Sequence, residues 1–417
     1  MLRALGHPVY RRLLAAQVVA LLGTGLGTVA LGLLAHDLAG PRAGAVLGTA
    51  FAVKMLAYVL VAPLASALLA RRSRRAVLVG ADVVRVAVAA ALPFVGEVWQ
   101  VYLLVFVLQA ASATFTPTFQ SVVPDVLVEE DDYTAGLSLS RLAYDLEAVV
   151  SPLLAAALLL VVPASTLFAG TALGCAASAL LVAATVLPRR TGADEPDRDA
   201  GSFGRRARRG VVLFVRTPGL RPVLALNLAV ASAGAFVLVQ AVVTARDVLG
   251  RGDGAVALLL AATGAGSMVG AFVLPALLRR VPERPVMLVG GAVAAAATLL
   301  VPVALALPSE GAVGAPAALW AAVGLGWSAA ETPVGRLLRR HVPAPDLPDA
   351  FAAQFSLSHA CWLVTYPLAG WLGLAVGTGA TALWLGGLAV AATVVAARSW
   401  PTRVVVSSAP EVHDVGA

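Results

Sequence analysis

Long apolar stretches separated by short polar segments run along almost the entire chain. Each holds roughly 20 residues or more, the length that an α-helix needs to cross the hydrocarbon core of a bilayer, about 30 Å thick. The pattern predicts an all-α membrane protein with twelve transmembrane helices. We place them at residues 13–35, 44–69, 76–95, 98–122, 138–162, 164–187, 219–245, 254–278, 285–307, 313–338, 350–375 and 378–397.

The longest polar stretch between two predicted helices divides the chain into two sets of six. It runs from Pro188 to Pro218 and contains a basic run at 205–209. We therefore expect a first six-helix half at 1–187, a cytoplasmic linker at 188–218, a second half at 219–397 and a cytoplasmic tail at 398–417. The segment 203–215 fits either an amphipathic helix on the membrane surface or a solvated linker.

The composition narrows the class of protein further. Hydrophobic residues make up 59% of the chain and charged residues 13%, about half of the usual charged share of roughly 25% in soluble domains. This balance excludes a water-soluble globular protein and a disordered chain. The two cysteines lie inside apolar stretches, so no disulfide framework is expected.

The basic residues predict the orientation of the chain. With the N-terminus in the cytoplasm, 24 of the 30 lysine and arginine residues fall in inside segments, and the outside loops hold three. The positive-inside rule then predicts a multi-pass cell-membrane protein with both termini in the cytoplasm. The inside loop 124–133 is acidic, but acidic residues contribute little to this rule. Because the basic residues lie in short loops and not along one polar face, we expect no nucleic-acid binding.

Three short motifs recur in the same order in both halves. Segment 74–80 matches 284–290, segment 137–141 matches 355–359, and the motif at Pro152 matches the one at Pro367, with offsets of 210, 218 and 215 residues. Both halves start on the same side of the membrane, so they are parallel repeats. Such repeats occur in transporters, where they are related by an axis along the membrane normal.

The basic loop at 66–75 resembles a motif of a known family. It reads Ser-Ala-Leu-Leu-Ala-Arg-Arg-Ser-Arg-Arg, and the major facilitator superfamily has Gly-x-x-x-Asp-Arg-x-x-Arg-Arg between its second and third spans. The resemblance implies that Arg71, Arg74 and Arg75 form a gate motif on the cytoplasmic side. Ser66 and Ala70 replace the glycine and the aspartate, so the latch that the aspartate makes is lost or relies on another acid.

The resemblance covers essentially the whole chain and implies two six-helix halves that work by alternating access. Span five keeps only Pro152 of the Gly-Pro-x-x-Gly-Gly motif found in many exporters of this superfamily, which points to export. Segments 106–120 and 356–367 resemble a bacterial exporter-like branch, some members of which carry a nickel-resistance label. The histidine-rich tail expected of a nickel exporter is absent, because the final residues hold only His413.

Ionisable side chains inside predicted spans are candidate functional groups, because a charge at the bilayer centre costs about 2.5–3.5 kcal/mol on insertion scales. Lys54 lies about ten residues into the second span, which places it near the midplane at a rise of 1.5 Å per residue. We expect it to form a packing ion pair with an acid on a neighbouring span or to contact the substrate or the coupling ion. Both alternatives remain open on the sequence.

The fifth span holds three further charges. Arg141 and Asp145 are four residues apart and share a helix face, whereas Glu147 points elsewhere and has no partner on its own helix. Removal from water favours the neutral carboxyl group, which suits a carboxylate that binds protons. We therefore expect Glu147 to be the better proton carrier, with a structural role as the alternative.

Two more charged positions have a structural alternative. Asp82 and Arg85 are three residues apart, and we expect a local ion pair on the third span. Glu331, near the inner end of span ten, is a candidate charge-relay residue or forms an inside gate pair with Arg336 or Arg339.

Four uncharged polar side chains are candidates for the substrate cavity: Gln109, Thr114, Asn227 and Gln240. The resemblance implies that spans four and seven, which carry Gln109 and Asn227, line this cavity. His359 in span eleven is expected to be a hydrogen-bonded packing residue or a titrating group. No second histidine lies three or four residues away from it, so we predict no metal site, and we predict no cofactor.

Taken together, the sequence predicts a secondary active transporter, because it contains no ATPase motif. We expect a proton-coupled exporter of small amphipathic organic compounds, since a mostly apolar cavity suits apolar or weakly polar cargo. A divalent metal-ion (nickel-like) exporter, an uncoupled facilitator, a membrane enzyme and a non-transporting receptor are the alternatives. Five scattered histidines argue against an enzyme. The expected partners are a small-molecule substrate, protons and the lipid bilayer, and the protein is expected to act as a monomer.

Overall fold

The computed structural model describes residues 2–68, 72–187, 211–307, 313–343 and 346–401. The side chains of residues 2–3, 62–68, 117, 348 and 349 and of several residues in 130–149, Arg141 and Asp145 among them, lie outside this description. Throughout the described ranges, every regular element is a helix.

The first part of the chain forms a group of long helices, which we call the first group. Its elements are α1 (Leu2–Gly6), α2 (Pro8–Ala39), η1 (Gly40–Arg42), α3 (Ala43–Leu68), α4 (Arg74–Ala91), η2 (Leu92–Phe94), α5 (Val98–Val126), α6 (Glu130–Leu158) and α7 (Thr166–Ala183).

The part of the chain after residue 210 forms the second group, which begins with a helical turn at 211–216. Its elements are α9 (Arg221–Val239), α10 (Ala241–Val243), the π-helical turn η4 (Thr244–Val248), α11 (Asp253–Leu277), α12 (Glu283–Leu299), α13 (Val301–Leu305), α14 (Gly314–Glu331), α15 (Val334–His341) and α16 (Leu347–Ser399).

Local sequence signals explain where several helices begin and end. Pro8 stands in the first turn of α2, where its missing N–H costs no helical hydrogen bond. The Ser73 hydroxyl accepts from the Ala76 N–H at 3.2 Å and caps α4. Gly40 ends α2 with a φ of 52°, and Gly377 interrupts α16 with a φ of 81°, a region that favours glycine.

Eight helical segments of the described residues are long and apolar enough to cross a membrane. Two of them, Pro8–Val61 and Ala350–Ser399, run for 54 and 50 residues. A straight helix of 50 residues would be about 75 Å long, far more than one bilayer core. Gly40 and the short helix η1 break the first segment, and Gly377 breaks the second. Large apolar side chains such as Phe272, Leu173 and Trp384 are 67–71% exposed, as expected for a surface in contact with lipid.

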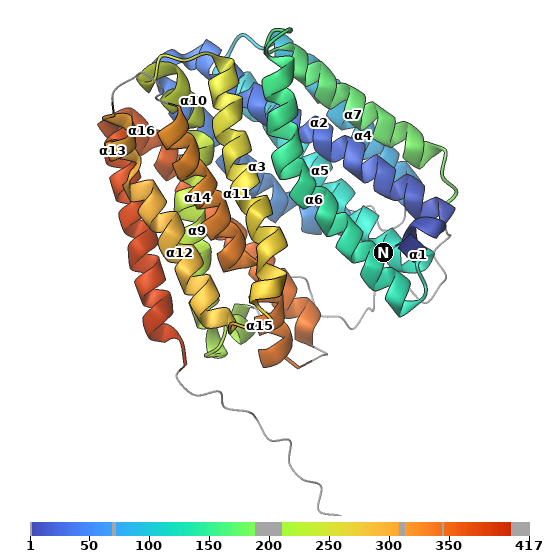
Figure 1. Ribbon diagram of the computed structural model, residues 1–417. Coiled ribbons are helices and arrows are strands. Elements are labelled where there is room, and N and C mark those ends of the chain that lie inside the picture. Colours follow the sequence, from blue (N-terminus) through green and yellow to red (C-terminus); the bar gives the residue numbers. More distant parts are fainter. Residues whose placement is uncertain (1, 69–71, 188–210, 308–312, 344–345, 402–417) are drawn as a thin grey trace, which may run out of the picture.

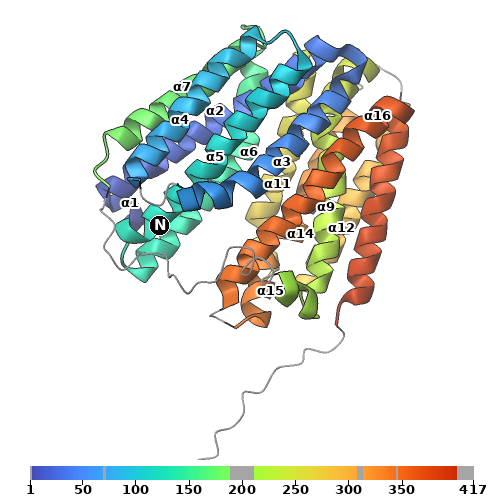
Figure 2. The same ribbon diagram turned by 180° about the vertical axis from the view of Figure 1, so that it is seen from behind.

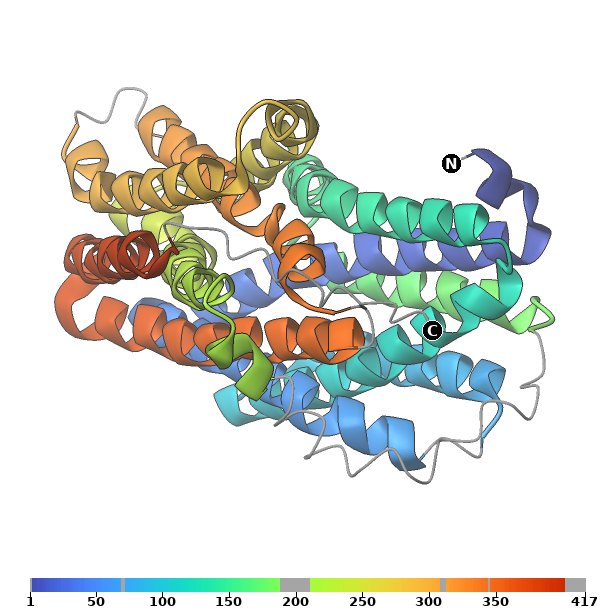
Figure 3. The same cartoon turned by 90° about the horizontal axis from the view of Figure 1, so that it is seen from below.

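The two groups of helices lie side by side (Figures 1 and 2). Seen from below, α6 lies beside α11 on one side and α3 beside α16 on the other (Figure 3). In Figure 1 the groups converge at the end that carries η1 and α10 and spread apart toward the end that carries α1 and α15. We call these the η1 end and the α1 end.

Small residues allow the close approach of α3 and α16 at the η1 end. A Cβ atom at Gly370 would overlap the Gly44 carbonyl oxygen, and one at Gly48 would overlap the carbonyl oxygen of Tyr366. Phe51 and Tyr366 continue this contact, with ring centroids 5.0 Å apart. Glycine at helix contacts is a common device in membranes, where packing must replace the hydrophobic effect.

One expected loop is shorter than predicted. The acidic stretch 124–133 was expected to be an inside loop, but α5 continues to Val126 and α6 starts at Glu130. Acidic residues at the start of a helix interact favourably with its dipole, which explains the longer helix. The Asp132 carboxylate also contacts the His7 ring, with Oδ2 and Nε2 3.2 Å apart. The segment 203–215 lies largely outside the described residues; its last five residues are helical.

Candidate functional site

A buried ion pair lies in the middle of the first group. The Arg85 guanidinium donates to Asp82 Oδ1 at 2.8 Å, and both side chains are at most 6% exposed. Arg85 also donates to the Thr24 hydroxyl at 3.2 Å and lies 5.3 Å from the centroid of the Phe115 ring. The pair therefore links α4 to α2 and α5, and cation–π contact adds to the electrostatic attraction.

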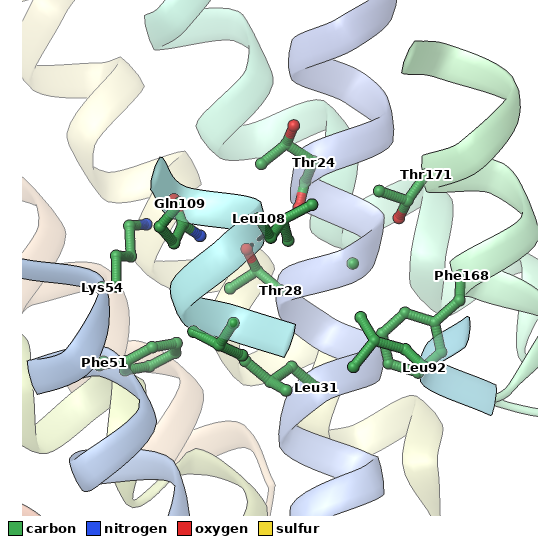
Figure 4. Close-up of a pocket in the computed structure, with 12 residues that line it drawn as sticks. Thr24, Thr28, Leu31, Phe51, Lys54, Leu92, Leu108, Gln109, Phe168 and Thr171 are labelled. Atoms are coloured by element: carbon green, nitrogen blue, oxygen red, sulfur yellow. Dashed lines mark hydrogen bonds between the residues drawn. The ribbon is translucent and has the colours of Figure 1, made fainter. Parts of the chain in front are cut away.

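A small cavity of about 30 Å³ opens next to this pair, between α2, α3, α5 and α7 (Figure 4). Thr24, Thr28, Lys54, Gln109 and Thr171 supply its polar lining, and Phe51 and Phe168 are among its apolar residues. A space of this size with several polar partners suits about one water molecule. Figure 4 shows the Lys54 ammonium group reaching toward Gln109, so both predicted residues face one polar space.

Lys54 of α3 and Glu147 of α6 attract each other electrostatically. The Ser151 hydroxyl donates to the Glu147 carboxylate from one turn further along α6. A Cβ atom at Gly25 would overlap both the Glu147 carboxylate and the Ser151 side chain, so the glycine in α2 makes room for them. The arrangement places two opposite charges on two helices so that they attract each other, with the carboxylate next to Gly25 of a third helix.

The second group holds amides in place of these charges. Asn227 of α9 and Gln354 of α16 exchange two hydrogen bonds, of 3.2 and 3.0 Å, and both residues are buried. The fully buried Gln240 donates to the Ala369 carbonyl oxygen at 2.7 Å and accepts from the Thr378 hydroxyl at 3.3 Å. These two predicted substrate contacts therefore hold α9 to α16 in this structure.

The remaining predicted residues occupy separate places. Thr114 lines a groove between α3, α4 and α5, and its hydroxyl donates to the Ala110 carbonyl oxygen. Glu331 ends α14 and interacts electrostatically with Cys361 of α16. Arg336, expected as a gate partner of Glu331, pairs with Glu283 at 3.1 Å.

His359 lies next to the contact between the two groups. Its ring stacks on Phe355 at 3.9 Å between centroids, and Tyr58 of α3 lies 6.2 Å away. Lys54 and His359 also interact electrostatically.

Two of the three arginines of the predicted gate motif, Arg74 and Arg75, lie among the described residues. Arg74 forms an ion pair with Asp125 at the end of α5, and Arg75 donates to the Ala183 carbonyl oxygen at the end of α7. Arg71 lies outside the described residues, as does Ala70, which stands in place of the motif's aspartate. Asp125 is thus an acid close to the motif that the sequence motif itself did not reveal.

Sequence reasoning missed a polar cluster that joins the two groups at the η1 end. Arg246 donates to Asp37 at 2.7 Å and also pairs with Asp253. His36 contacts Asp247 at 2.7 Å and Arg246 at 2.9 Å. His36 and Asp37 near the end of α2 and Arg246 and Asp247 in η4 could have been matched as opposite charges at the ends of the first and seventh spans.

A row of aromatic rings was also missed. Trp327 of α14, Trp362 and Tyr366 of α16 and Phe51 of α3 are in successive contact at 4.9–5.0 Å between centroids. Gly234 of α9 leaves room for the Trp362 ring. Within the described residues, no group of three or more histidine, cysteine, aspartate or glutamate side chains is placed to hold a metal ion.

Several solved transporter structures share this arrangement of helices. A nucleoside transporter, NupG, superimposes with a TM-score of 0.71 at 11% sequence identity, over 95% of this chain and 100% of that chain. A bacterial homologue of the human lysosomal transporter Spinster, in an inward-facing and unoccupied conformation, gives a TM-score of 0.71 at 14% identity, over 94% and 97%. The POT family transporter PepTSo gives 0.66 at 14% identity, over 94% and 97%. At such identities the likeness shows the fold alone.

The chain also matches a curated relative in sequence. The chain is 28% identical to macrolide efflux protein A of Streptococcus pyogenes over 149 residues. The match spans 34% of this chain and 36% of the relative, about one third of its length. The model of the Major Facilitator Superfamily matches residues 13–344, most of the chain. The chain is therefore a member of the Major Facilitator Superfamily, a multi-pass membrane transporter of small molecules.

Proposed function

We propose that this transporter is a proton-coupled exporter of small amphipathic organic compounds. One observation carries the proposal: Lys54 of α3 and Glu147 of α6 are opposite charges that attract each other inside the first group. These two helices of the first group also pack against the second group, α3 on α16 and α6 on α11. A change in the protonation of this pair therefore acts where the two groups meet.

The proposed mechanism is alternating access of two six-helix halves, 1–187 and 219–397, joined by a cytoplasmic linker. The two breaks at Gly40 and Gly377 divide the longest segments and turn the eight apolar segments into ten. The long helices α6 and α14 add two more, which supports a count of twelve spans. With both termini in the cytoplasm, the η1 end faces the outside. The structure then corresponds to a state closed to the outside by the glycine contacts of α3 and α16 and by the ion pairs of Arg246.

In this mechanism the proton and the lysine compete for one carboxylate. With Glu147 ionised, Lys54 is attracted to it and ties α3 to α6. A proton on Glu147 removes that attraction and leaves Lys54 with only Gln109 and the polar cavity as its polar surroundings. Since a charge is costly in a low-dielectric environment without a partner, the two states differ in energy and bias the packing of α3 and α6 against the second group.

Export of organic compounds rests on two supports. The relative that matches one third of this chain is named for macrolide efflux, and Pro152 of the exporter motif stands inside α6. Trp327, Trp362, Tyr366 and Phe51 offer flat apolar surfaces beside the charge pair, which suits an amphipathic substrate.

The test is flux in proteoliposomes with an imposed pH gradient, using a panel of dyes and drugs that includes a macrolide, alongside Ni²⁺ and Co²⁺. We expect organic-substrate flux that needs the gradient, and a loss of about 10²-fold or more in Glu147→Gln, the size typical for removal of an essential proton-transfer group. Lys54→Ala is expected to uncouple flux from the gradient.

Glu129→Gln is the matched control, because Glu129 is exposed and precedes the same helix. Gradient-independent flux in the wild type would replace the proposal with a facilitator. Metal flux would replace it with a metal exporter. Equal flux in Glu147→Gln and Glu129→Gln would remove the charge pair from the mechanism.

A further inference from the structure

Two apolar grooves lie at equivalent places in the two helix groups. The first, of about 540 Å³, runs between α3 and α4 with α5 as its floor. The second, of about 350 Å³, runs between α11 and α12 with α14 as its floor. Gly80 lines the first and Gly290 the second, and these glycines correspond in the sequence repeat at an offset of 210 residues. The grooves are therefore a repeated feature of the fold.

The first groove opens on the outer surface of its group. Gly80 and Val84 on its α4 wall are exposed, and a Cβ atom at Gly80 would meet nothing within 4 Å. Gln109, which faces the internal polar cavity, lies on the opposite side of α5 from Val107 and Ala111 in the groove, since each residue turns a helix by about 100°. In a membrane protein, such an outer apolar face is in contact with lipid.

The two grooves differ in their polar residues. The second is lined by apolar residues and glycine alone. The first ends at Arg72, an exposed arginine two residues before the start of α4, at the α1 end of the molecule. The neighbouring Arg74 and Arg75 are held by Asp125 and the Ala183 carbonyl oxygen, so Arg72 is the arginine placed at the groove to meet an anion.

We infer that the groove between α3, α4 and α5 binds one anionic phospholipid. An acyl chain lies along Ala76, Gly80 and Val84, and the phosphate of the headgroup pairs with Arg72. The charge of Arg72 and the apolar lining that continues from it match the two parts of such a lipid. The second groove takes acyl chains without selecting a headgroup. This inference does not depend on which substrate the transporter carries.

The test is native mass spectrometry of the purified full-length protein titrated with phosphatidylglycerol or phosphatidylethanolamine. We expect the wild type to retain phosphatidylglycerol about fivefold more tightly, the factor that one arginine near an anionic headgroup contributes. Arg72→Gln is expected to abolish this preference. Arg339→Gln, an exposed arginine at the same end of the second group, is expected to keep it.

Gly80→Leu tests the groove itself, because Gly80 lines the groove and a Cβ atom there meets nothing within 4 Å, so a larger side chain is expected to extend into the groove. It is expected to reduce retention of both lipids, as is Ala76→Leu, a second groove variant. Gly387→Leu is the matched control, since Gly387 is exposed on α16 and also has open space at its Cβ position. Equal retention in Gly80→Leu, Ala76→Leu and Gly387→Leu would overturn the site. An unchanged preference in Arg72→Gln would overturn its selectivity for anionic lipid.

Discussion

The interiors of the two helix groups are built differently. The first group encloses the ion pair of Asp82 and Arg85 and a polar cavity that Lys54 lines. The second group encloses uncharged amides, with Asn227 paired to Gln354, and very close backbone contacts such as that of Gly324 with Thr263. The contrast teaches that the repeat preserves helix positions but not chemistry. The buried Asp82–Arg85 ion pair of the first group thus stands against the buried Asn227–Gln354 amide pair of the second.

The two groups also differ in the ion pairs at their α1 ends. At the α1 end of the first group, a basic residue at the start of α4, Arg74, pairs with Asp125 at the end of α5. At the equivalent end of the second group, the acidic residue is at the start of α12, where Glu283 pairs with Arg336 and Arg340 of α15. Both pairs tie the same two helices of the repeat, with the signs of charge exchanged.

Removing one member of the buried pair should have the largest effect. Arg85→Met leaves the Asp82 carboxylate buried without its partner, which typically costs about 3–5 kcal/mol. We expect a large fall in the melting temperature of the detergent-purified protein, followed by labelling of the buried Cys175 thiol in a Cys361→Ser background.

The double variant Asp82→Asn with Arg85→Met removes both charges and is the control. It is expected to be clearly more stable than Arg85→Met alone. Equal melting temperatures for the two variants would show that the isolated carboxylate is not the cause.

Close packing of the second group predicts a smaller effect for one added methyl group. In Gly324→Ala the new Cβ atom overlaps the Thr263 carbonyl oxygen, and overpacking of this kind costs about 1–3 kcal/mol. Gly80→Ala in the first group adds its methyl group to open space, where alanine is favoured over glycine in a helix by about 0.5–1 kcal/mol. Melting temperatures should therefore shift in opposite directions, and a fall in both would contradict the difference in packing between these two positions.

The two amides expected to line the substrate cavity should separate into different roles. Asn227→Ala leaves the buried Gln354 amide without its partner, which costs about 1–3 kcal/mol, with little effect on transport at saturating substrate. Gln109→Ala, next to Lys54, is expected to change the KM or the coupling with a smaller loss of stability. Melting and proteoliposome flux measured on the same samples decide this, and the reverse assignment would place the substrate in the second group.

The sequence predicts where several helices begin, because an apolar stretch of about 20 residues is easy to recognise. The described helices α4, α5 and α11 begin within two residues of the predicted spans 76–95, 98–122 and 254–278. The start of α6 was placed eight residues too late, at 138, because the acidic residues after Glu129 were taken for a loop. Charge alone does not distinguish a loop from a helix N-terminus.

Contacts between helices were harder to predict from the sequence than the helices themselves. The spacing of Asp82 and Arg85 predicts their contact, because three residues along a helix bring side chains to one face. The attraction between Lys54 and Glu147, about ninety positions apart, follows from how the helices of the first group are arranged, and a single sequence does not contain that information. For the same reason the partners of Gln240 and the matching of Asp37 with Arg246 emerge only in three dimensions.

The ion pairs at the η1 end respond to the salt concentration of the solution around them. Asp37 is 55% exposed and Asp247 35% exposed, so dissolved salt reaches these pairs. The screening length falls from about 10 Å at 0.1 M to about 3 Å at 1 M, whereas the Asp82–Arg85 pair is shielded from salt by the helices around it. Higher ionic strength at this end therefore weakens the attraction between the two groups there, while the buried Asp82–Arg85 pair in the interior is little affected.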